Sequence, residues 1–366
     1  MILMNDFRAE DPAVRQAMQM AAERVFESGW YVLGKEVESF ECRWAEICNL
    51  PYGVGTGNGM DALEIALRAL GISSGDEVIT TPMTAFATVL AILRAGAIPV
   101  LADIDADTAL LSLESVRRCL TPRTKALILV HLYGQVRQMD SWLTFCGDAG
   151  IELIEDCAQA HLASSRGRIA GSMGRVGAYS FYPTKNLGAA GDAGMLVTRD
   201  GSLAKQAMQL RNYGQSERYL HPVLGLNSRL DELQAAILSA RLPWLSEFTA
   251  RRRAIAKRYF LGIKNPYVTL PALPEEENSH VYHLFVINCT ERDYLQSHLH
   301  ARGVQTLCHY PVPVHHQPPC LGIRYDPCGL PVAEQHAANC LSLPCHPLMS
   351  EADVEYVITA VNEFAK

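Results

Sequence analysis

The chain has 366 residues, of which 49% are hydrophobic and 19% charged, and its formal net charge is −7 at pH 7. This length predicts about two domains, and the apolar fraction is large enough to form a substantial core. The only tight basic run is Arg251 to Arg253, so the chain lacks the positive surface with which proteins neutralise the phosphates of nucleic acid. We therefore expect a soluble, two-lobed protein without a nucleic-acid partner.

Cysteine usage and the N-terminus indicate the compartment. The eleven cysteines contain no CxxC pair and no zinc-type spacing with histidine, which is typical of reduced, structural thiols. The N-terminus lacks a basic stretch followed by an apolar one, and no apolar run approaches the ~18 residues that a membrane span requires. We expect a cytoplasmic protein with no metal site and no membrane partner.

Short apolar strands and helical patterns alternate along the first part of the chain. This alternation is typical of an α/β fold in which helices cover both faces of a mostly parallel sheet. Strands are predicted at residues 78–81, 98–103, 126–131, 151–155, 176–181 and 195–198, with helices such as 87–95 and 115–120 between them.

The composition changes in the last third of the chain, which predicts a second lobe. A long helical stretch over 228–261 leads away from the first lobe, and a proline-rich, acidic connector follows it at 266–278. We divide the chain into a large domain at 1–250 and a small α+β domain at 251–366. The small domain is expected to contain a strand at 280–288, a helix at 292–302 capped by Thr290 and a closing helix at 351–364 capped by Ser350.

Two charged side chains follow neighbouring strands of this predicted sheet. Asp156 follows the apolar run 151–154, with only Glu155 between them, and Lys185 comes just after the run 176–181. Taken singly, such an aspartate is most often a helix cap, and such a lysine is most often a solvated surface charge. Together they lie at the carboxyl ends of strands, where open α/β folds bind their ligands.

Pyridoxal 5'-phosphate (PLP) chemistry requires this pair of charges. The cofactor is held as a Schiff base on a lysine, and its pyridine nitrogen must stay protonated to withdraw electrons from the substrate. A carboxylate within a few ångströms favours the protonated ring by roughly one to three pKa units. Desolvation beside a cationic ring lowers the pKa of lysine from about 10.4, so Lys185 can serve as the base as well as the tether.

A glycine-rich turn that runs into an amphipathic helix, within residues 54–70, predicts a phosphate site. The free N–H groups at the start of such a helix bind anions, and glycine lets a phosphate approach closely. The sequence is not a P-loop, because no Gly-Lys-Ser/Thr follows the glycines, and it does not match GxGxxG. We assign the cofactor phosphate to the amides of Gly59, Met60 and Asp61, with the hydroxyl of Ser180 as a further donor.

Several longer motifs occur in one order along nearly the whole chain. They are GWYVLGKEVESFE at 29–41, GDEVITTP, HLYGQ, EDCAQAH, SFYPTKNLG, GLNSRLDELQAAIL, HYPVPVHHQP and LSLPCHP. In this order they resemble the DegT/DnrJ/EryC1/StrS family of PLP-dependent sugar aminotransferases. The resemblance implies the fold of type I PLP-dependent transferases, which is that of aspartate aminotransferase, and a homodimer with shared active sites.

The resemblance also implies roles for single residues. Lys185 would carry PLP as a Schiff base, Asp156 would contact the pyridine nitrogen, and Gln159 would lie near the ring or its phenolic oxygen. Ser180 and the amides around Met60 would hold the phosphate. Asn227, in GLNSR, would reach the phosphate of the neighbouring subunit.

One departure from the family pattern concerns ring stacking. The family often reads P-x-T-F/W/Y-x-A-T, with the aromatic side chain stacked on the cofactor ring. Here residues 82–88 read PMTAFAT, so Ala85 occupies that position and Phe86 follows it. We expect Phe86 to stack on the ring instead.

Family members usually move an amino group from L-glutamate to a ketosugar carried on a nucleotide diphosphate. The segments HYPVPVH at 309–315 and NGMDAL at 58–63 resemble the members that aminate C3 of a dTDP-linked 3-keto-6-deoxyhexose. His131 and Tyr133, in HLYGQ, are interpreted as structural. The candidate substrate contacts are His309, Tyr310 and His315 for the sugar or nucleotide, Lys35 and Arg229 for the diphosphate, and Trp30 and Tyr31 for the mouth of the site.

Other functions remain open at this point. Aminotransferases that act on UDP-4-ketosugars or aminocyclitols are the competing enzymes, because a fold does not determine a substrate. Related sugar 3-dehydratases have histidine in place of the lysine, and Lys185 argues against that activity. A PLP-binding regulatory protein would be a function of another class, and a damaged lysine, aspartate or phosphate site would indicate it.

Overall fold

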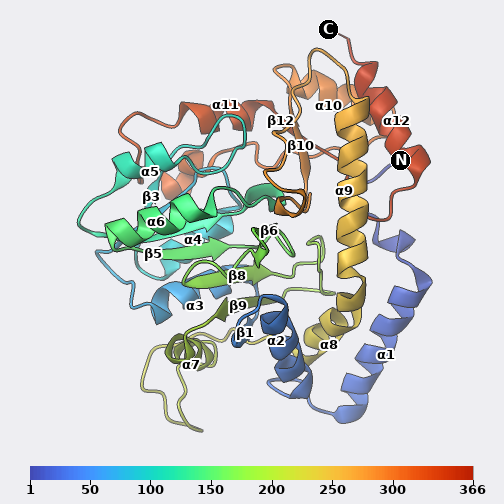
Figure 1. Ribbon diagram of the computed structural model, residues 1–366. Helices are drawn as coiled ribbons and strands as arrows, with labels where there is room; N and C mark the ends of the chain where they lie inside the picture. Colours follow the sequence, from blue (N-terminus) through green and yellow to red (C-terminus); the bar gives the residue numbers. More distant parts are fainter. Residues whose placement is uncertain (366) are drawn as a thin grey trace.

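The computed structural model describes residues 1–365, and its centre is an eight-stranded sheet with the order β1-β9-β8-β5-β4-β2-β3-β11 (Figure 1). The strands from β8 to β11 are parallel to one another, whereas β9 is antiparallel to both of its neighbours. The predicted mostly parallel sheet is confirmed. The strands are β1 (Tyr52–Thr56), β2 (Glu77–Thr80), β3 (Ile98–Leu101), β4 (Thr124–Val130), β5 (Glu152–Asp156), β8 (Val176–Ser180), β9 (Gly194–Thr198) and β11 (Arg324–Tyr325).

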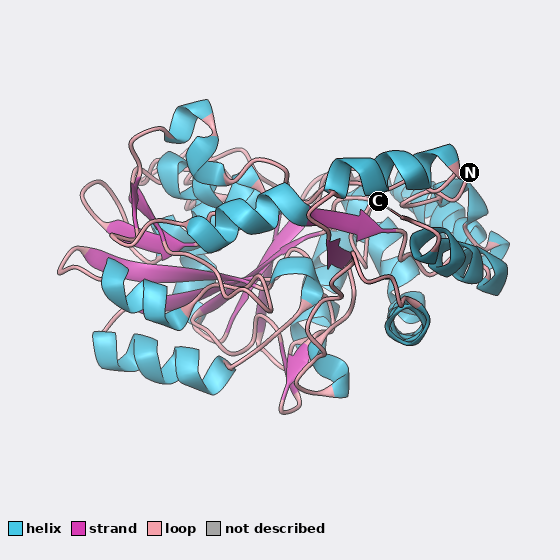
Figure 2. Ribbon diagram, turned by 90° about the horizontal axis from the view of Figure 1, so that it is seen from above, coloured by secondary structure: helices cyan, strands magenta, loops and turns pink. Residues whose placement is uncertain are grey.

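Helices cover both faces of this sheet, so its central strands are buried on both sides and read as nearly continuous apolar runs. Figure 2 shows the sheet between two helical layers, with a smaller group of helices and short strands beside it. One face packs against α3 (Gly59–Ala69), α4 (Phe86–Arg94) and α7 (Gly201–Leu210). The other face packs against α2 (Lys35–Ile47), α5 (Leu113–Cys119), α6 (Met139–Ala149) and α8 (Glu232–Arg241).

The long helix predicted over 228–261 is two helices in the structure. Helix α8 begins only at Glu232, and a 3-10 turn over Leu242–Trp244 separates it from α9 (Leu245–Gly262). This turn contains Pro243, which has no backbone N–H to donate to the preceding turn. Helix α1 (Pro12–Ser28) packs along α8. Among the described residues no helix combines the length and apolar character that crossing a bilayer needs.

A second core lies in the C-terminal part of the chain. The antiparallel pair β10 (Phe285–Asn288) and β12 (Cys340–Leu343) packs with α9, α10 (Arg292–Ala301) and α12 (Glu351–Asn362). Ser350 caps α12 as predicted, through its hydroxyl and the N–H of Asp353. The predicted Thr290 cap is wrong, because Glu291 occupies the N-cap of α10, and the strand predicted at 280–288 covers only its last four residues.

The packing crosses the predicted boundary between residues 250 and 251. Strand β11 pairs with β3 of the large sheet, and α11 (Pro331–Asn339) begins on the carboxylate of Asp103, which accepts bonds from the N–H groups of Val332 (3.1 Å) and Ala333 (2.9 Å). At the other end of the chain, Ile2 forms a parallel bridge with Val304. The two-domain division therefore stays a prediction, with contacts in both directions across it.

Apart from the sheets described above, β6 (Ser164–Ser165) and β7 (Arg168–Ile169) form a small antiparallel hairpin.

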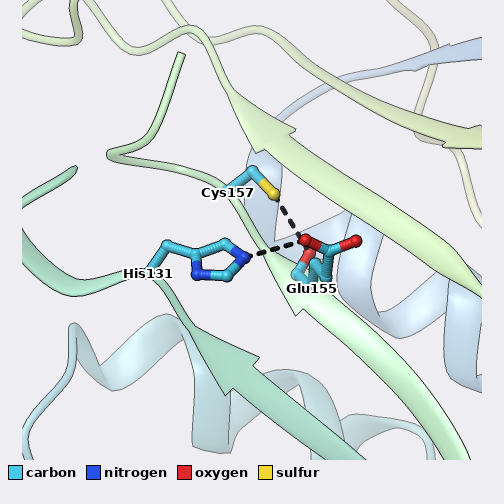
Figure 3. A group of neighbouring side chains, drawn as sticks. All are labelled: His131, Glu155 and Cys157. Carbon is cyan, nitrogen blue, oxygen red and sulfur yellow. Dashed lines mark hydrogen bonds and ion pairs between the residues drawn. The ribbon is translucent and has the colours of Figure 1, made fainter. Parts of the chain in front are cut away.

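Glu155 holds together the segments beside the carboxyl end of β5. Its carboxylate lies 2.9 Å from Nε2 of His131 (Figure 3). It also accepts bonds from the N–H groups of Gly171, Met173 and Gly174. The fully buried carboxyl has a lowered pKa because the bond to His131 and the backbone N–H groups outweigh the cost of burial. This contact supports the structural interpretation of His131 and fixes the loop that leads into β8.

Replacing Glu155 with Ala is expected to destabilise the protein by about 3–5 kcal/mol, because the buried His131, two buried N–H groups and one partly buried N–H group lose their acceptor. Glu152→Ala on the same strand is the matched control. The Glu152 carboxylate is about half exposed and lies 3.9 Å from Arg175, so about 0.5 kcal/mol or less is expected. Chemical denaturation followed by circular dichroism measures both. Equal losses for the two variants would contradict the anchoring role of Glu155.

Candidate active site

Asp156 and Lys185 lie at the same edge of the sheet. Asp156 is the last residue of β5 and pairs with Ala178 of the parallel neighbour β8, whose last residue is Ser180. The chain then turns, and the N–H of Lys185 donates to the carbonyl of Tyr182 at 2.8 Å. The structure thus brings together the two residues that the sequence singled out, and their charges act on each other.

The Asp156 carboxylate is buried and firmly held. Its two oxygens accept bonds from the N–H of Ala158 at 3.1 Å and from the hydroxyl of Thr88 at 2.9 Å. Burial raises the pKa of Asp156, and those two bonds together with the charge of Lys185 oppose the rise. Thr88 was missed from the sequence, although its position early in α4, just after a strand end, pointed to this edge of the sheet.

The amine of Lys185 is desolvated. Burial lowers its pKa to about 8, and the attraction of Asp156 limits the drop. At neutral pH a larger share of this amine is therefore free than in ordinary lysine. This lowering was expected beside a cationic ring, and in the structure burial alone supplies it.

The loop that carries Lys185 is tied down on both sides. Asn186 lies 3.2 Å from Nδ1 of His283 and donates to the carbonyl of Val281 at 3.3 Å. A Cβ on Gly188 would lie 2.3 Å from the carbonyl oxygen of Pro183, so only glycine permits this close turn. The position of the lysine is thus set by backbone and side-chain contacts that extend into the C-terminal part of the chain.

The start of α3 adjoins Ser180, as the phosphate prediction requires. A Cβ on Gly59 would lie 2.6 Å from Cβ of Ser180, so the two backbones meet at the end of β8. The Asp61 amide donates to the Asn58 side chain at 2.8 Å, so its contact with the phosphate stays a prediction without support from this geometry. Asn58 caps the helix, and the amides of Gly59 and Met60 with the Ser180 hydroxyl are left as donors for an anion.

Gln159 is held from both sides. Its side-chain oxygen accepts the N–H of Tyr133 at 2.6 Å, and its amide nitrogen donates to the hydroxyl of Tyr310 at 3.2 Å. Tyr133 has a left-handed backbone with φ of 61°, and its hydroxyl donates to the carbonyl of His309. Tyr133 therefore does more than fill space, since it connects Gln159 to the segment that carries two of the substrate candidates.

His309 and Tyr310 lie at this site. Burial and the charge of Lys185 lower the pKa of His309 to about 4, while burial and Asp156 raise the pKa of Tyr310 to about 12. His315 is placed differently, because its Nε2 lies 3.1 Å from Glu334 and its ring contacts His316 and Tyr325. These contacts give no support to His315 as a substrate residue.

The other candidates lie on more exposed segments. Trp30 and Tyr31 are 62% and 53% exposed, and Lys35 is the first residue of α2. Trp30, Lys35 and eight further residues line a cavity of about 620 Å³ between α1 and α2, which also reaches Glu232 of α8. The guanidinium of Arg229 lies 5.2 Å from the ring centre of Tyr213.

Two cofactor candidates remain predictions. Phe86 is the partly buried first residue of α4. It lies two positions before Thr88, whose hydroxyl bonds to Asp156, so Phe86 lies near the edge of the sheet that carries Asp156. Asn227 is exposed, while its neighbour Ser228 accepts the N–H of Gly57 at 3.0 Å. Asn227 therefore lies beside the glycine turn and faces outward, as a contact to a second subunit would require.

These residues fit PLP. A buried carboxylate, a desolvated amine and two helix-start amides beside a serine converge at the carboxyl ends of β5 and β8. Asp156 would hold the pyridine nitrogen, Lys185 would hold the carbonyl carbon, and Gly59, Met60 and Ser180 would hold the phosphate. Each of the three charged or polar regions of the cofactor has a partner of the correct chemistry.

The chain belongs to the DegT/DnrJ/EryC1/StrS aminotransferase family, whose sequence profile matches residues 12–362. It is a PLP-dependent aminotransferase of fold type I. It is 44% identical to the dTDP-3-amino-3,4,6-trideoxy-alpha-D-glucose transaminase of Streptomyces venezuelae, covering 99% of this chain and 95% of the relative. The dTDP-3-amino-3,6-dideoxy-alpha-D-galactopyranose transaminase of Aneurinibacillus thermoaerophilus is 43% identical, with coverage of 100% and 99%. A crystal structure of S. venezuelae DesV with a ketimine intermediate superposes with a TM-score of 0.95 at 44% identity, covering 99% of this chain and 98% of that one.

The lowered pKa of Lys185 predicts that its amine loses its proton at a lower pH than the amine of an ordinary lysine. In the apoenzyme, half-maximal reaction of its amine with acetic anhydride is expected near pH 8, about two units below a free lysine side chain. Peptide mass spectrometry measures the labelling, with a synthetic peptide of residues 180–190 as the reference. Asp156→Asn should move the midpoint further down, because the attraction that favours the charged amine is lost. A midpoint equal to that of the peptide would contradict the desolvated site.

Proposed function

We propose that this enzyme transfers the amino group of L-glutamate to a nucleotide-linked ketosugar, with a dTDP-3-keto-6-deoxyhexose as the substrate. The observation that carries the proposal is identity of 44% and 43%, over essentially the whole chain, to two transaminases named for dTDP-3-aminosugars. The site supports it, because the lysine, the aspartate and the phosphate-binding helix start are all intact.

Each half of the reaction uses the same residues of this chain. When bound, PLP withdraws electrons from the substrate carbon that carries nitrogen. The free amine of Lys185 would take the proton from that carbon of glutamate and hold it for the transfer that completes this half of the reaction. In the second half it moves a proton back onto the carbon that was the sugar ketone. The carboxylate of Asp156, kept in place by Thr88 and the N–H of Ala158, would hold the proton on the ring nitrogen.

The sugar nucleotide would bind on the segments that surround this edge. His309 and Tyr310 lie beside Lys185 and Asp156 and offer a neutral imidazole and a phenol to sugar hydroxyls. The exposed Trp30 and Tyr31 offer flat surfaces for a base, and Lys35 and Arg229 offer cations for the diphosphate. UDP-4-ketosugars and aminocyclitols are less favoured, since both relatives described above carry dTDP-linked 3-amino sugars in their names.

The proposal includes a cytoplasmic homodimer in which each active site takes Asn227 from the other subunit. Its support is the exposed Asn227 beside the glycine turn and the exposed apolar side chains of the same loop, such as Leu224 at 85% and Tyr219 at 81%. A partner subunit would cover such a surface. A role as a PLP-binding regulator is not favoured, because none of the three elements that the chemistry needs is damaged.

A panel of keto-nucleotide sugars tests the substrate. With L-glutamate and PLP, conversion of a dTDP-3-keto-6-deoxyhexose is expected to exceed that of UDP-4-ketosugars, as measured by mass spectrometry of the aminosugar. Lys185→Ala should abolish turnover, because the group that moves the proton is gone, while Lys205→Ala on the exposed face of α7 should leave it unchanged. Turnover only with a UDP-4-ketosugar would refute the assigned substrate, and an active Lys185→Ala enzyme would refute the mechanism.

Mixed dimers test the shared site. Lys185→Ala and Asn227→Ala subunits, each inactive or nearly so alone, should regain up to half of the wild-type activity per mixed dimer, because one of its two sites then has both native residues. The activity of a dual-tagged, purified mixed dimer gives the result. The double variant Lys185→Ala/Asn227→Ala mixed with wild type controls for subunit exchange. Absence of any recovery would place Asn227 in its own subunit's site, and a fully active Asn227→Ala homodimer would place it outside the site.

A further inference from the structure

We propose that His315, His316 and Glu334 form a binding site for a divalent transition-metal ion. The two histidines end the 3-10 turn Val314–His316, and Glu334 lies in the first turn of α11. These three residues lie outside the catalytic residues described above. The sequence predicted no metal site, because its cysteines show no zinc-type spacing with histidine and residue 334 is distant in sequence from residues 315 and 316.

The positions of the ligand atoms favour coordination. Nε2 of His315 lies 3.1 Å and Nε2 of His316 lies 3.6 Å from the same oxygen of Glu334, and the three atoms all lie within 4.8 Å of one another. Ligands about 2.0–2.1 Å from a tetrahedral ion lie about 3.3 Å apart, which is close to the mean of these two distances. An ion could therefore be bound with only small movements of the three side chains.

The donor set selects the kind of ion. Two imidazoles and one carboxylate suit Zn²⁺, Co²⁺, Ni²⁺ or Cu²⁺, whereas Mg²⁺ and Ca²⁺ prefer oxygen ligands only. The side chains of His316 and Glu334 are 52% and 48% exposed, so an ion can reach the site from solvent, while the side chain of His315 is 8% exposed and forms its floor. With three protein ligands, a tetrahedral ion would keep one position for water.

A second group of possible ligands shows why this one is preferred. His131, Glu155 and Cys157 also lie within 4.8 Å of one another, but all three are buried (Figure 3). Glu155 already accepts three backbone N–H groups besides its contact with His131, and burial raises the pKa of the Cys157 thiol well above its ordinary value. That group is satisfied within the protein, whereas Glu334 has only the two imidazoles as described partners.

An ion at this site would join two segments. The 3-10 turn belongs to the stretch 309–316, which begins with His309 and Tyr310 beside the cofactor residues, and α11 packs on the large sheet through Asp103. Binding would therefore restrain the end of the 309–316 segment and stabilise the native protein against unfolding.

Cobalt provides a direct test on the PLP-loaded enzyme. We expect one tightly bound Co²⁺ per chain by equilibrium dialysis, with the visible absorption of tetrahedral cobalt, and a higher melting temperature with Co²⁺ than without it. His316→Ala and Glu334→Gln should each weaken binding by roughly tenfold or more and remove the stabilisation. Because both side chains are about half exposed, the variants should fold, and their cofactor content and circular dichroism check this.

Matched controls distinguish this site from adventitious binding. His300→Ala removes an exposed histidine on α10, and Cys328→Ser removes an exposed thiol, and neither should change cobalt affinity. Mg²⁺ at the same concentration should not displace cobalt. The proposal is overturned if the wild-type enzyme binds no stoichiometric cobalt. It is also overturned if cobalt binding survives both site variants, because the ion is then held by thiols or by the cofactor.

Discussion

The buried attraction between Asp156 and Lys185 is the constraint on which the site depends. Burial moves the two pKa values toward each other, raising that of the carboxyl and lowering that of the amine to about 8. The charge of each group opposes the pKa shift of the other, so both pKa shifts are smaller than burial alone would produce. The pair is therefore poised, with a carboxylate that can hold a proton on a ring nitrogen and an amine that is free often enough to act as nucleophile and base.

Such a pair is tolerable only where other groups hold it in place. Thr88 and the N–H of Ala158 satisfy the aspartate, and the Lys185 loop is tied by Asn186 and by the close approach of Gly188 to Pro183. Behind them Glu155 collects three backbone N–H groups and one imidazole. Removing one partner of a buried charge costs more than the pair itself contributes, so these supports are as necessary as the charges.

The sequence predicted the central strands because both faces of each are buried, which leaves nearly continuous apolar runs. It missed β1, whose YGVGT is rich in glycine, and β11, which is only two residues of partly exposed Arg and Tyr. Asp156, Lys185 and the Gly59–Ser180 neighbourhood were predictable because strand ends and helix starts are local signals. Apolar periodicity does not report local backbone geometry. It therefore did not predict that the Asn58 side chain accepts the Asp61 amide N–H, that the long helix breaks at Pro243, or that Tyr133 has a left-handed backbone.

Catalytic and substrate residues are held by different kinds of structure, which explains why the reaction is easier to assign than the sugar. Of the two proposed catalytic groups, Asp156 ends the buried strand β5, and Lys185 lies on the tied loop that directly follows the buried strand β8. The substrate candidates lie on connections: the 309–316 segment, the exposed turn at Trp30 and Tyr31, and the loop before α8. The sequences of loops can change without disturbing the sheet, so the same cofactor site can serve enzymes that act on many sugars. Tyr133 links the two kinds of structure, since its N–H holds Gln159 and its hydroxyl holds His309, and it thereby sets the distance between the cofactor edge and the substrate segment.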